Sequence, residues 1–500
     1  MNHENLSDAL DCVRDSYLAE AAAPKKKRPL VYFSAIAAGL AVVLLIAALW
    51  PSFTRNIPVA ESMMEAPESN LYAGADEYVT NCHDPLEDTL LHFEALSTPL
   101  YPTMAPYPKS NSDTVGYDKW AASRKQQYAQ PEGYANGTAP FFKESLRTFL
   151  ATEKDNALCS PLSIYMALAM SAELTCGNTQ QQLLDTLGAD SLDALRTQAM
   201  HIWNANYCDD GATTSVLASS LWLDDSLPCY AQTANNLSRF YYASVFQKDY
   251  DDPETNVLYT DWLNSQTGGL LEDGIIPLDP QAVLTLCTTV HYQERWQALF
   301  SENDLRSGIF HGTAGDTEVT YLTADDPAGT YYWGDGYGAC CLMTENGNRM
   351  WLILPDEGKT PQDVLQSEDV FSMVLGGAEQ WQNKRSMMVH LSMPCFDITT
   401  QAELSGGLKA MGITDLLDPA LADFSPLTAE PVYLQEANHS IRVSVDEEGI
   451  SAAAYTALSC YAAGAPQTDE IDIILDRPFF FVLTSRDNLP ILSGVVNQIS

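Results

Sequence analysis

Apolar positions after Phe141 follow two different periods. In some segments apolar residues recur three and four positions apart, which predicts helices, while shorter runs rich in β-branched and aromatic residues predict strands. The predicted helices cover residues 141–150, 163–174, 230–242 and 404–411, and the predicted strands cover residues 215–223, 282–292, 349–354, 387–393, 441–445, 479–484 and 491–496. Because the two kinds mix without regular alternation, the pattern predicts an α+β fold with mainly antiparallel sheets.

Residues 30–50 form an uncharged apolar stretch of about 21 residues, which is enough to cross a bilayer as a helix. Residues 25–28 are all Lys or Arg. The positive-inside rule then places residues 1–29 in the cytoplasm and everything after residue 50 outside. A cleaved signal peptide is the alternative, but its apolar core usually has only about 7–15 residues and its polar lead is shorter. We therefore predict a retained single-pass anchor in the cell membrane.

Residues 51–138 are rich in Pro, Ser, Tyr, Asn and acidic residues, and no core-forming pattern persists among them. Pro-rich tracts such as residues 101–108 are extended and semi-rigid. This part is predicted to be an extracellular linker, followed by a folded domain over residues 139–500. Its tyrosines are numerous for a linker, which indicates docking of some parts on the domain or on a cell wall.

The chain is strongly acidic, with a formal net charge of −40 at pH 7. Five acidic and five basic residues balance one another within residues 1–50, so the excess negative charge lies in residues 51–500. Because nucleic-acid affinity depends on Lys and Arg at the phosphates, this charge argues against a nucleic-acid partner. It favours solubility and attraction to basic partners.

Motifs for metal, cofactor or hydrolase chemistry are missing from the sequence. None of the eleven cysteines has C-x-x-C spacing, and neither G-x-S-x-G nor H-E-x-x-H occurs. Gly334–Gly338 lacks the spacing of a dinucleotide loop and is interpreted as a hairpin turn. We therefore predict no metal, no cofactor, no disulfide framework and no catalytic residue.

The stretch from Val445 to Gly464 is the most informative one. It begins with acidic residues, turns at Gly449 and continues as a run of small residues with almost no charge. Side chains alternate faces along a strand. One face would carry Ile450, Ala452, Ala454, Thr456, Leu458 and Cys460, and the other Ser451, Ala453, Tyr455, Ala457 and Ser459. This composition suits a segment that is exposed at first and later inserts into a sheet; an Ala-rich helical turn is the alternative.

Several separated motifs resemble those of the serpin family and follow the family's order. They are N-x-x-x-S-P-x-S-I at residues 156–164, L-P-x-x-G at residues 354–358, P-x-F at residues 394–396, L-x-x-x-G-I at residues 408–413, R-P-F at residues 477–479 and the closing strand at residues 494–497. The resemblance covers about residues 141–500. It implies a serpin fold, with helices packed on large sheets and an exposed reactive-centre loop, in a membrane-anchored member of bacterial type.

The resemblance further implies a suicide inhibitor of serine proteases rather than an enzyme. The target protease attacks a bond of the loop with its own nucleophile and forms an acyl-enzyme. The cut loop then inserts as a new central strand of the large sheet and traps the protease. The native fold is therefore a metastable state held by a kinetic barrier. We expect the inhibitor to be a monomer.

Matching positions give the roles that the resemblance implies. The loop hinge is implied at Glu447, Gly449, Ile450, Ala452, Ala453 and Ala454, the shutter beneath the sheet at Ser160, Ser163, Thr288 and His439, and the breach at the top of the sheet at Trp296. Two positions depart from the family pattern. Thr288 stands where the family has Asn, so we expect the hydrogen-bond network of the shutter to differ. Cys395 stands where the family has the Lys that pairs with the hinge glutamate, so we expect the sheet to open more easily.

The bond that the protease would cut is read in two ways. Counting seventeen positions from Glu447 gives Ala463–Gly464, whereas counting back from Pro478 gives Gln467. Small residues before the first bond imply an elastase- or subtilisin-like target. Tyr461 keeps a chymotrypsin-like or a cysteine protease open. The alternative function is a non-inhibitory binding or adhesion module with the same fold.

Overall fold

The computed structural model describes residues 95–499, except for residues 111–112, 153, 270–276, 299, 327–328, 436 and 451–468. Its α-helices are α4 (Thr114–Gln127), α5 (Ala139–Phe149), α6 (Pro161–Leu174), α7 (Gly177–Leu187), α8 (Leu192–Asn206), α9 (Ala231–Tyr241), α10 (Pro253–Thr267), α11 (Pro361–Leu365), α12 (Glu368–Gly376) and α13 (Ser405–Ala410). Two short 3₁₀ helices are η1 (Glu302–Asp304) and η2 (Asp415–Leu417).

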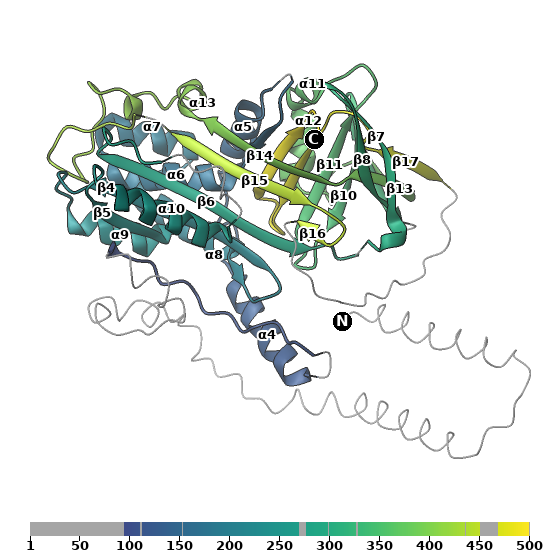
Figure 1. Cartoon of the computed structure of the whole chain (residues 1–500), viewed down its shortest axis with the longest axis horizontal. Helices are drawn as coiled ribbons and strands as arrows, with labels where there is room; N and C mark the ends of the chain where they lie inside the picture. The colour runs from purple at the N-terminus through teal and green to yellow at the C-terminus, as the bar shows by residue number, and fades with distance from the viewer. Residues whose placement is uncertain are drawn as a thin grey trace, which may run out of the picture. The chain divides into compact units, whose positions relative to one another are not determined.

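The largest sheet runs diagonally across Figure 1 and holds the long strands β6 and β15 side by side. Its strand order is β1 (Ala95–Ser97), β5 (Ala243–Lys248), β4 (Thr214–Asp224), β6 (Leu284–Arg295), β16 (Gly449–Ile450), β15 (Asn438–Val445) and β14 (Phe396–Glu403), and β3 (Cys208–Asp209) pairs with β4. Among these pairs, β4 and β5 are parallel. The short strand β16 thus lies between the two long central strands.

Two further sheets form the other part of the fold (Figure 1). The second sheet has the order β12 (Lys384–Ser386), β9 (Thr330–Gly334), β10 (Tyr337–Met343), β11 (Arg349–Pro355), β18 (Phe479–Thr484), β19 (Pro490–Val496) and β2 (Ala157–Cys159). The third has the order β17 (Glu470–Ile474), β13 (Met388–Pro394), β8 (Gly315–Asp326) and β7 (Leu305–Gly312). Apart from β13 with β17, the pairs are antiparallel. The predicted α+β class with mainly antiparallel sheets is confirmed.

Helix α6 lies at the centre of the core because it is apolar on nearly every side. Pro161 occupies its first turn, and the Ser160 side chain caps it by accepting the N–H of Ser163. All of its residues except Ala167 are buried. A helix that is hydrophobic all round must be covered on all sides. Helix α6 accordingly contacts β6 of the first sheet and β19 of the second.

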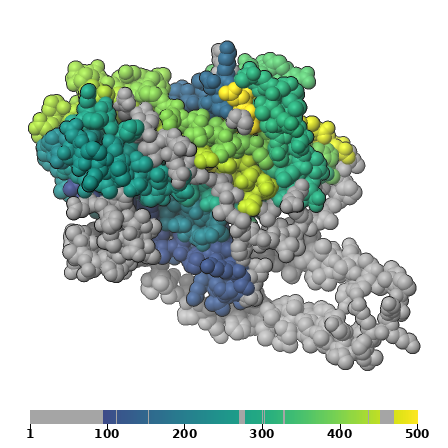
Figure 2. All heavy atoms as spheres, in the orientation of Figure 1, coloured from purple at the N-terminus to yellow at the C-terminus, as the bar shows by residue number. Residues whose placement is uncertain are grey.

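The first sheet has apolar residues on both faces, as strand alternation allows. On β4, Leu217 and Leu221 join the main core, while Ala218 and Trp222 face a separate cluster with Trp262 of α10. The two clusters show that α10 covers the face opposite to α6. In Figure 2 the yellow-green residues of β15 lie at the surface of the face shown.

Residues 95–138 of the predicted linker dock on the domain, as the numerous tyrosines indicated for some parts of it. Ala95 pairs with Phe246 of β5, and the ring of Tyr101 lies 5.1 Å from that of Trp203. The Trp120 indole donates to the Asp210 carboxylate at 2.7 Å. Aromatic rings supply the contacts that a Pro-rich segment cannot make through strand ladders, so this part docks on the domain.

The predicted membrane anchor at residues 30–50 and the linker before Ala95 lie outside the described residues. Over the part of the chain that is described, the structure contains no helix that is both long and apolar enough to span a bilayer. The anchor therefore stays a prediction from the sequence.

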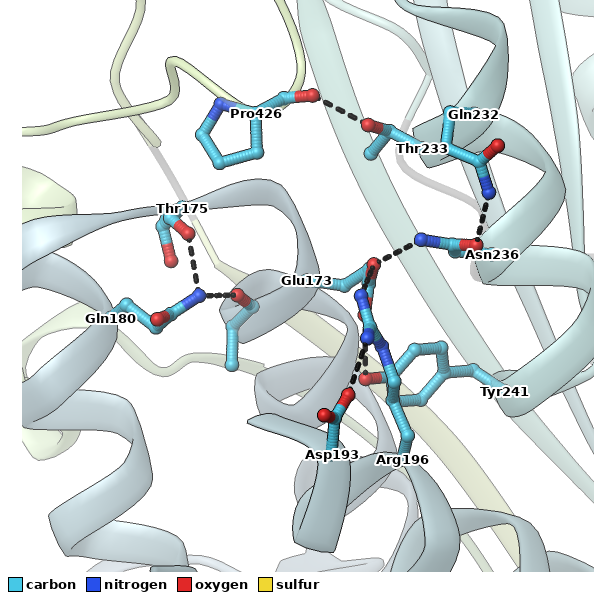
Figure 3. Close-up of polar contacts among 11 residues, drawn as sticks. Glu173, Thr175, Gln180, Asp193, Arg196, Gln232, Thr233, Asn236, Tyr241 and Pro426 are labelled. Carbon is cyan, nitrogen blue, oxygen red and sulfur yellow. Dashed lines mark hydrogen bonds and ion pairs between the residues drawn. The ribbon is translucent and has the colours of Figure 1, made fainter. Parts of the chain in front are cut away.

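A buried ion pair ties three helices together (Figure 3). The Glu173 carboxylate of α6 is 3% exposed and accepts two bonds from the Arg196 guanidinium of α8, at 2.6 and 2.7 Å. Asn236 and Tyr241 of α9 donate to the same carboxylate, at 2.7 and 3.2 Å. A bidentate guanidinium and two further donors satisfy a charge that would otherwise be costly to bury.

Removal of the Arg196 side chain tests the importance of this cluster. In Arg196→Met the carboxylate keeps its two neutral donors but loses its cation, so we expect a loss of about 3 kcal/mol in the free energy of unfolding. Urea unfolding at pH 7 measures it. Arg442→Met is the matched control, because Arg442 forms an equally short bidentate pair with Asp397 at the surface. The control should lose less than about 1 kcal/mol. Equal losses would contradict this account.

Candidate functional site

The chain that leaves β15 turns back at once and enters the first sheet as β16. Gly449 pairs with Arg295 and Ile450 pairs with Glu294, both on β6, while Ile450 also pairs with Val445 on β15. All these pairs are antiparallel. Ile450 is 2% exposed, so its side chain is already in the core. The described chain stops here and resumes at residue 469.

A tight turn at residues 446–449 makes this reversal. The Asp446 carboxylate accepts the backbone N–H groups of Glu448 and Gly449, at 2.9 and 3.1 Å. The Asp446 N–H donates to the Gly449 carbonyl at 3.1 Å. An aspartate that accepts from residues two and three positions ahead is a typical turn former.

Gly449 was predicted as the residue that permits the turn, and the structure gives a different reason for it. Its φ angle is not in the left-handed region. A Cβ atom at Gly449 would instead lie 2.2 Å from the carbonyl oxygen of Glu294. Two backbones approach too closely here for any side chain.

Trp296, predicted at the breach, holds the turn against the end of β6. It is 1% exposed, and its indole N–H donates to the Asp446 carbonyl at 2.8 Å. Its backbone N–H donates to the Glu448 carbonyl at 3.2 Å. Trp296 thus joins the hinge turn to β6, the strand that pairs with β16.

The predicted hinge residue Glu447 is half-buried next to Cys395. Burial, together with the negative charges of Glu447 and Asp446, raises the pKa of the Cys395 thiol to about 11. The thiol is therefore neutral near pH 7. Among the described residues Glu447 has no partner in an ion pair. The neutral Cys395 thiol lies at the position where the resemblance to serpins implied a lysine.

Three of the four predicted shutter residues come together at the start of α6. Ser160 donates its N–H to Nε2 of His439 on β15 at 3.1 Å. The Ser160 hydroxyl lies 3.1 Å from that of Ser163 and donates to the Ile491 carbonyl at 2.7 Å. Burial lowers the pKa of His439 to about 4, so its imidazole is neutral. The network joins β15 to α6 and β19.

Thr288 is not part of this network. It pairs with Ser219 on β4 and is half-buried, and no hydrogen bond joins it to His439 in the described structure. Its side chain is shorter than the asparagine that the family has there. The remaining predicted site residues, Ala452, Ala453, Ala454, Ala463 and Gly464, lie outside the described residues, as does Gln467.

Sequence reasoning missed a polar cluster beneath the hinge. Glu294 is 1% exposed and accepts hydrogen bonds from the Tyr292 hydroxyl and the Asn346 backbone N–H. The Asn348 side chain donates to it at 3.0 Å. Glu294 lies two positions before Trp296 in the sequence, and this acidic residue could have indicated the cluster. Its partners Asn346 and Asn348, however, lie about fifty residues away in the sequence.

Comparison with known proteins identifies this arrangement. The family model described as Serpin (serine protease inhibitor) matches residues 139–499. The chain belongs to the serpin family. The match begins where the folded domain was predicted to begin, and the docked segment of residues 95–138 precedes it.

The relatives of this serpin include known protease inhibitors. Plasminogen activator inhibitor 1 of Sus scrofa is 26% identical over 389 residues, which cover 70% of this chain and 92% of that protein. Human neuroserpin is 25% identical and covers 67% of this chain and 83% of its own length. The crystal structure of a thermophilic serpin, tengpin, in the native state has a TM-score of 0.65 at 24% identity, over 80% of this chain and 98% of that one. The serpin fold predicted from the sequence is confirmed.

Gly449→Ala tests the close approach of the two backbones. The added Cβ clashes with the Glu294 carbonyl, so we expect β16 to leave the sheet. Hydrogen exchange of the amides at residues 449–450 should then rise by about tenfold or more. Mass spectrometry of the peptide that spans the hinge measures this. Gly406→Ala is the control, because a Cβ at Gly406 meets nothing within 4 Å. Unchanged exchange in Gly449→Ala would contradict the account.

The pH dependence of stability tests the shutter. The folded state lowers the pKa of His439 from 6.5 to about 4. The unfolded chain therefore binds the extra proton first, and the network loses up to about 3 kcal/mol of stability as the pH falls from 6.5 to 4. In His439→Gln the side-chain oxygen still accepts from Ser160 but does not titrate. Denaturation curves at pH 7 and 4.5 should show a smaller acid loss in this variant, whereas the exposed-site control His311→Gln keeps it.

Proposed function

We propose that this serpin inhibits a serine protease by inserting its cleaved loop between β6 and β15. One observation carries the proposal: β16 already lies between these strands and is antiparallel to both. The first two residues of the inserted strand are therefore in register before any cleavage. Relatives such as plasminogen activator inhibitor 1 support the inhibitory class.

The register of β16 predicts how far insertion proceeds. Because Ile450 pairs with Glu294, continued antiparallel pairing brings residue 460 opposite Leu284, the first residue of β6. Ile450 faces the core, so the alternate residues down to Cys460 would share its face, and these are small or apolar. The bulky Tyr455 would point to the other face. A cut at Ala463–Gly464 leaves enough chain for this full length.

The target that fits this loop is an elastase- or subtilisin-like protease, since small residues precede the bond at Ala463. The alternative cut lies nearer Gln467. The alternative target is a chymotrypsin-like or cysteine protease. We further propose that residues 30–50 anchor the protein in the cell membrane as a single pass, with the serpin domain outside. The basic residues at 25–28 support that orientation.

The second candidate function is a serpin-fold binding or adhesion module that does not trap proteases. Two observations favour it. Thr288 stands outside the shutter network, and Cys395 provides no cation for Glu447. Such a module would still be cut in its loop by proteases but would release them.

Trapping is tested by mixing the full chain, purified in detergent, with pancreatic elastase or subtilisin and running a denaturing gel. We expect a stable band at the summed mass, because the acyl link survives denaturation. Ile450→Arg puts a charge on the buried face and should abolish the band while cleavage continues. Ser451→Arg, on the opposite face, is the matched control and should keep most of it. Cleavage without the band across a panel of proteases would favour the binding module.

A further inference from the structure

A polar cavity of about 140 Å³ lies where the docked N-terminal segment meets the rest of the domain. Its walls come from Tyr128 at the end of α4, Asn206 at the end of α8, the turn between β10 and β11, and the turn between β18 and β19. An apolar cavity of about 150 Å³ is large enough for benzene, so this one has room for about six non-hydrogen atoms. Because cavities that stay empty are apolar, a polar cavity holds either water or a polar molecule.

Two side-chain carbonyl groups of the lining have no hydrogen-bond donor. They are Oδ1 of Asn206 and Oδ1 of Asn346, and both residues are 5% exposed. The Asn206 Nδ2 group donates to the Ile202 carbonyl at 2.8 Å, which fixes the orientation of the amide. The Asn346 Nδ2 group donates to the Tyr128 hydroxyl at 2.6 Å. Unpaired buried acceptors are rare in folded proteins, so two of them in the lining of one cavity indicate a missing donor.

The mouth of the cavity carries a positive charge that is held in place. The Arg486 guanidinium lies 3.8 Å from the centre of the Tyr128 ring. Its stem packs on Gly347, where a Cβ atom would lie 3.2 Å from the Arg486 Cδ atom. No carboxylate among the described residues forms an ion pair with Arg486, so its hydrogen bonds are available to a ligand.

A hydroxyl group of the buried lining offers a second donor. The Ser485 oxygen accepts the backbone N–H groups of Asp487 and Leu489, at 3.3 and 3.2 Å. Within the described structure, its own proton has no acceptor. The lining therefore presents two uncommitted donors, Arg486 and Ser485, together with two uncommitted acceptors.

We propose that this cavity binds a small free α-amino acid. The carboxylate of the ligand accepts hydrogen bonds from Arg486 and Ser485, and a guanidinium–carboxylate pair is among the strong ones. The ammonium group donates to the Oδ1 atoms of Asn206 and Asn346. A simple carboxylate would leave both amide oxygens unpaired, and a simple amine would face the positive charge of Arg486.

The charge of the whole protein also favours such a ligand. An anion approaches this chain against a formal net charge of −40, whereas an α-amino acid has no net charge at neutral pH. The site goes beyond the proposed function, since no step of protease trapping depends on it.

Calorimetric titration of the full chain in detergent tests the proposal. The probes are L-alanine and L-serine, which are close to benzene in size. The controls are propionate, which lacks the ammonium group, and ethylamine, which lacks the carboxylate. We expect at least one of the amino acids to bind saturably, about tenfold or more tighter than either control. Its binding should also raise the melting temperature, because a ligand of the native state stabilises that state by mass action.

Two variants locate the binding. Arg486→Met keeps the stem on Gly347 and removes the cation, and Asn206→Leu removes one of the unpaired acceptors at similar volume. Each should weaken binding about tenfold or more. Arg486→Met suffices if Asn206→Leu does not fold, because Arg486 is exposed. Arg385→Met is the matched control: Arg385 is an exposed arginine outside the lining, and its removal should leave binding unchanged.

The outcomes decide between a ligand and water. If neither amino acid binds, if propionate or ethylamine binds as tightly, or if Arg486→Met binds like the original protein, the cavity holds buried water only and the inference is refuted. The proposed function stands in each of these cases, because the gel with elastase or subtilisin measures it separately. Tight binding of an amino acid that is lost in Arg486→Met and kept in Arg385→Met supports the site.

Discussion

The approach of two backbones at Gly449 is the constraint on which the rest of this serpin depends. With no side chain at this position, the chain leaving β15 can lie against the Glu294 carbonyl and start a strand. The Asp446 turn and the Trp296 indole then keep that start in place. In the described structure, β6 and β15 are joined through this two-residue strand. The two long central strands are therefore already separated by β16 at this end of the sheet.

Two buried titratable groups hold the sheet at its opposite ends, and their effects on stability have opposite signs. His439 lies near the start of β15 and stabilises the fold when neutral, so its contribution grows as the pH rises from 4 to 6.5. Glu294 lies beside the hinge at the other end, and its contribution falls as the pH rises towards 7. The two contributions therefore oppose one another at mildly acidic pH.

Much of this architecture could be predicted from the sequence. The strands at 349–354 and 479–484 are continuous apolar runs, and the structure confirms both of them as β11 and β18. The shutter residues were implied by the resemblance of residues 156–164 to a serpin motif, and the structure brings Ser160, Ser163 and His439 together at the start of α6. Glu294 was missed because the stretch Gln293–Arg295 looks like an ordinary polar strand end. Its burial results from partners in another sheet, which no local pattern reveals.

Docking of the N-terminal segment was predicted only for unspecified parts of it, and the contacts that it makes matter for the hinge. Residues 95–138 resemble a linker because apolar residues do not recur at a regular spacing in this Pro-rich part of the chain. Isolated aromatic rings are nevertheless enough to dock it on the domain. At the end of α4, Tyr128 accepts a hydrogen bond from the Asn346 side-chain amide, and the Arg486 guanidinium lies 3.8 Å from the centre of its ring. Asn346 in turn holds Glu294. The docked segment of residues 95–138 therefore contacts the turn that holds the end of β6, and it shares one hydrogen-bonded cluster with the largest sheet.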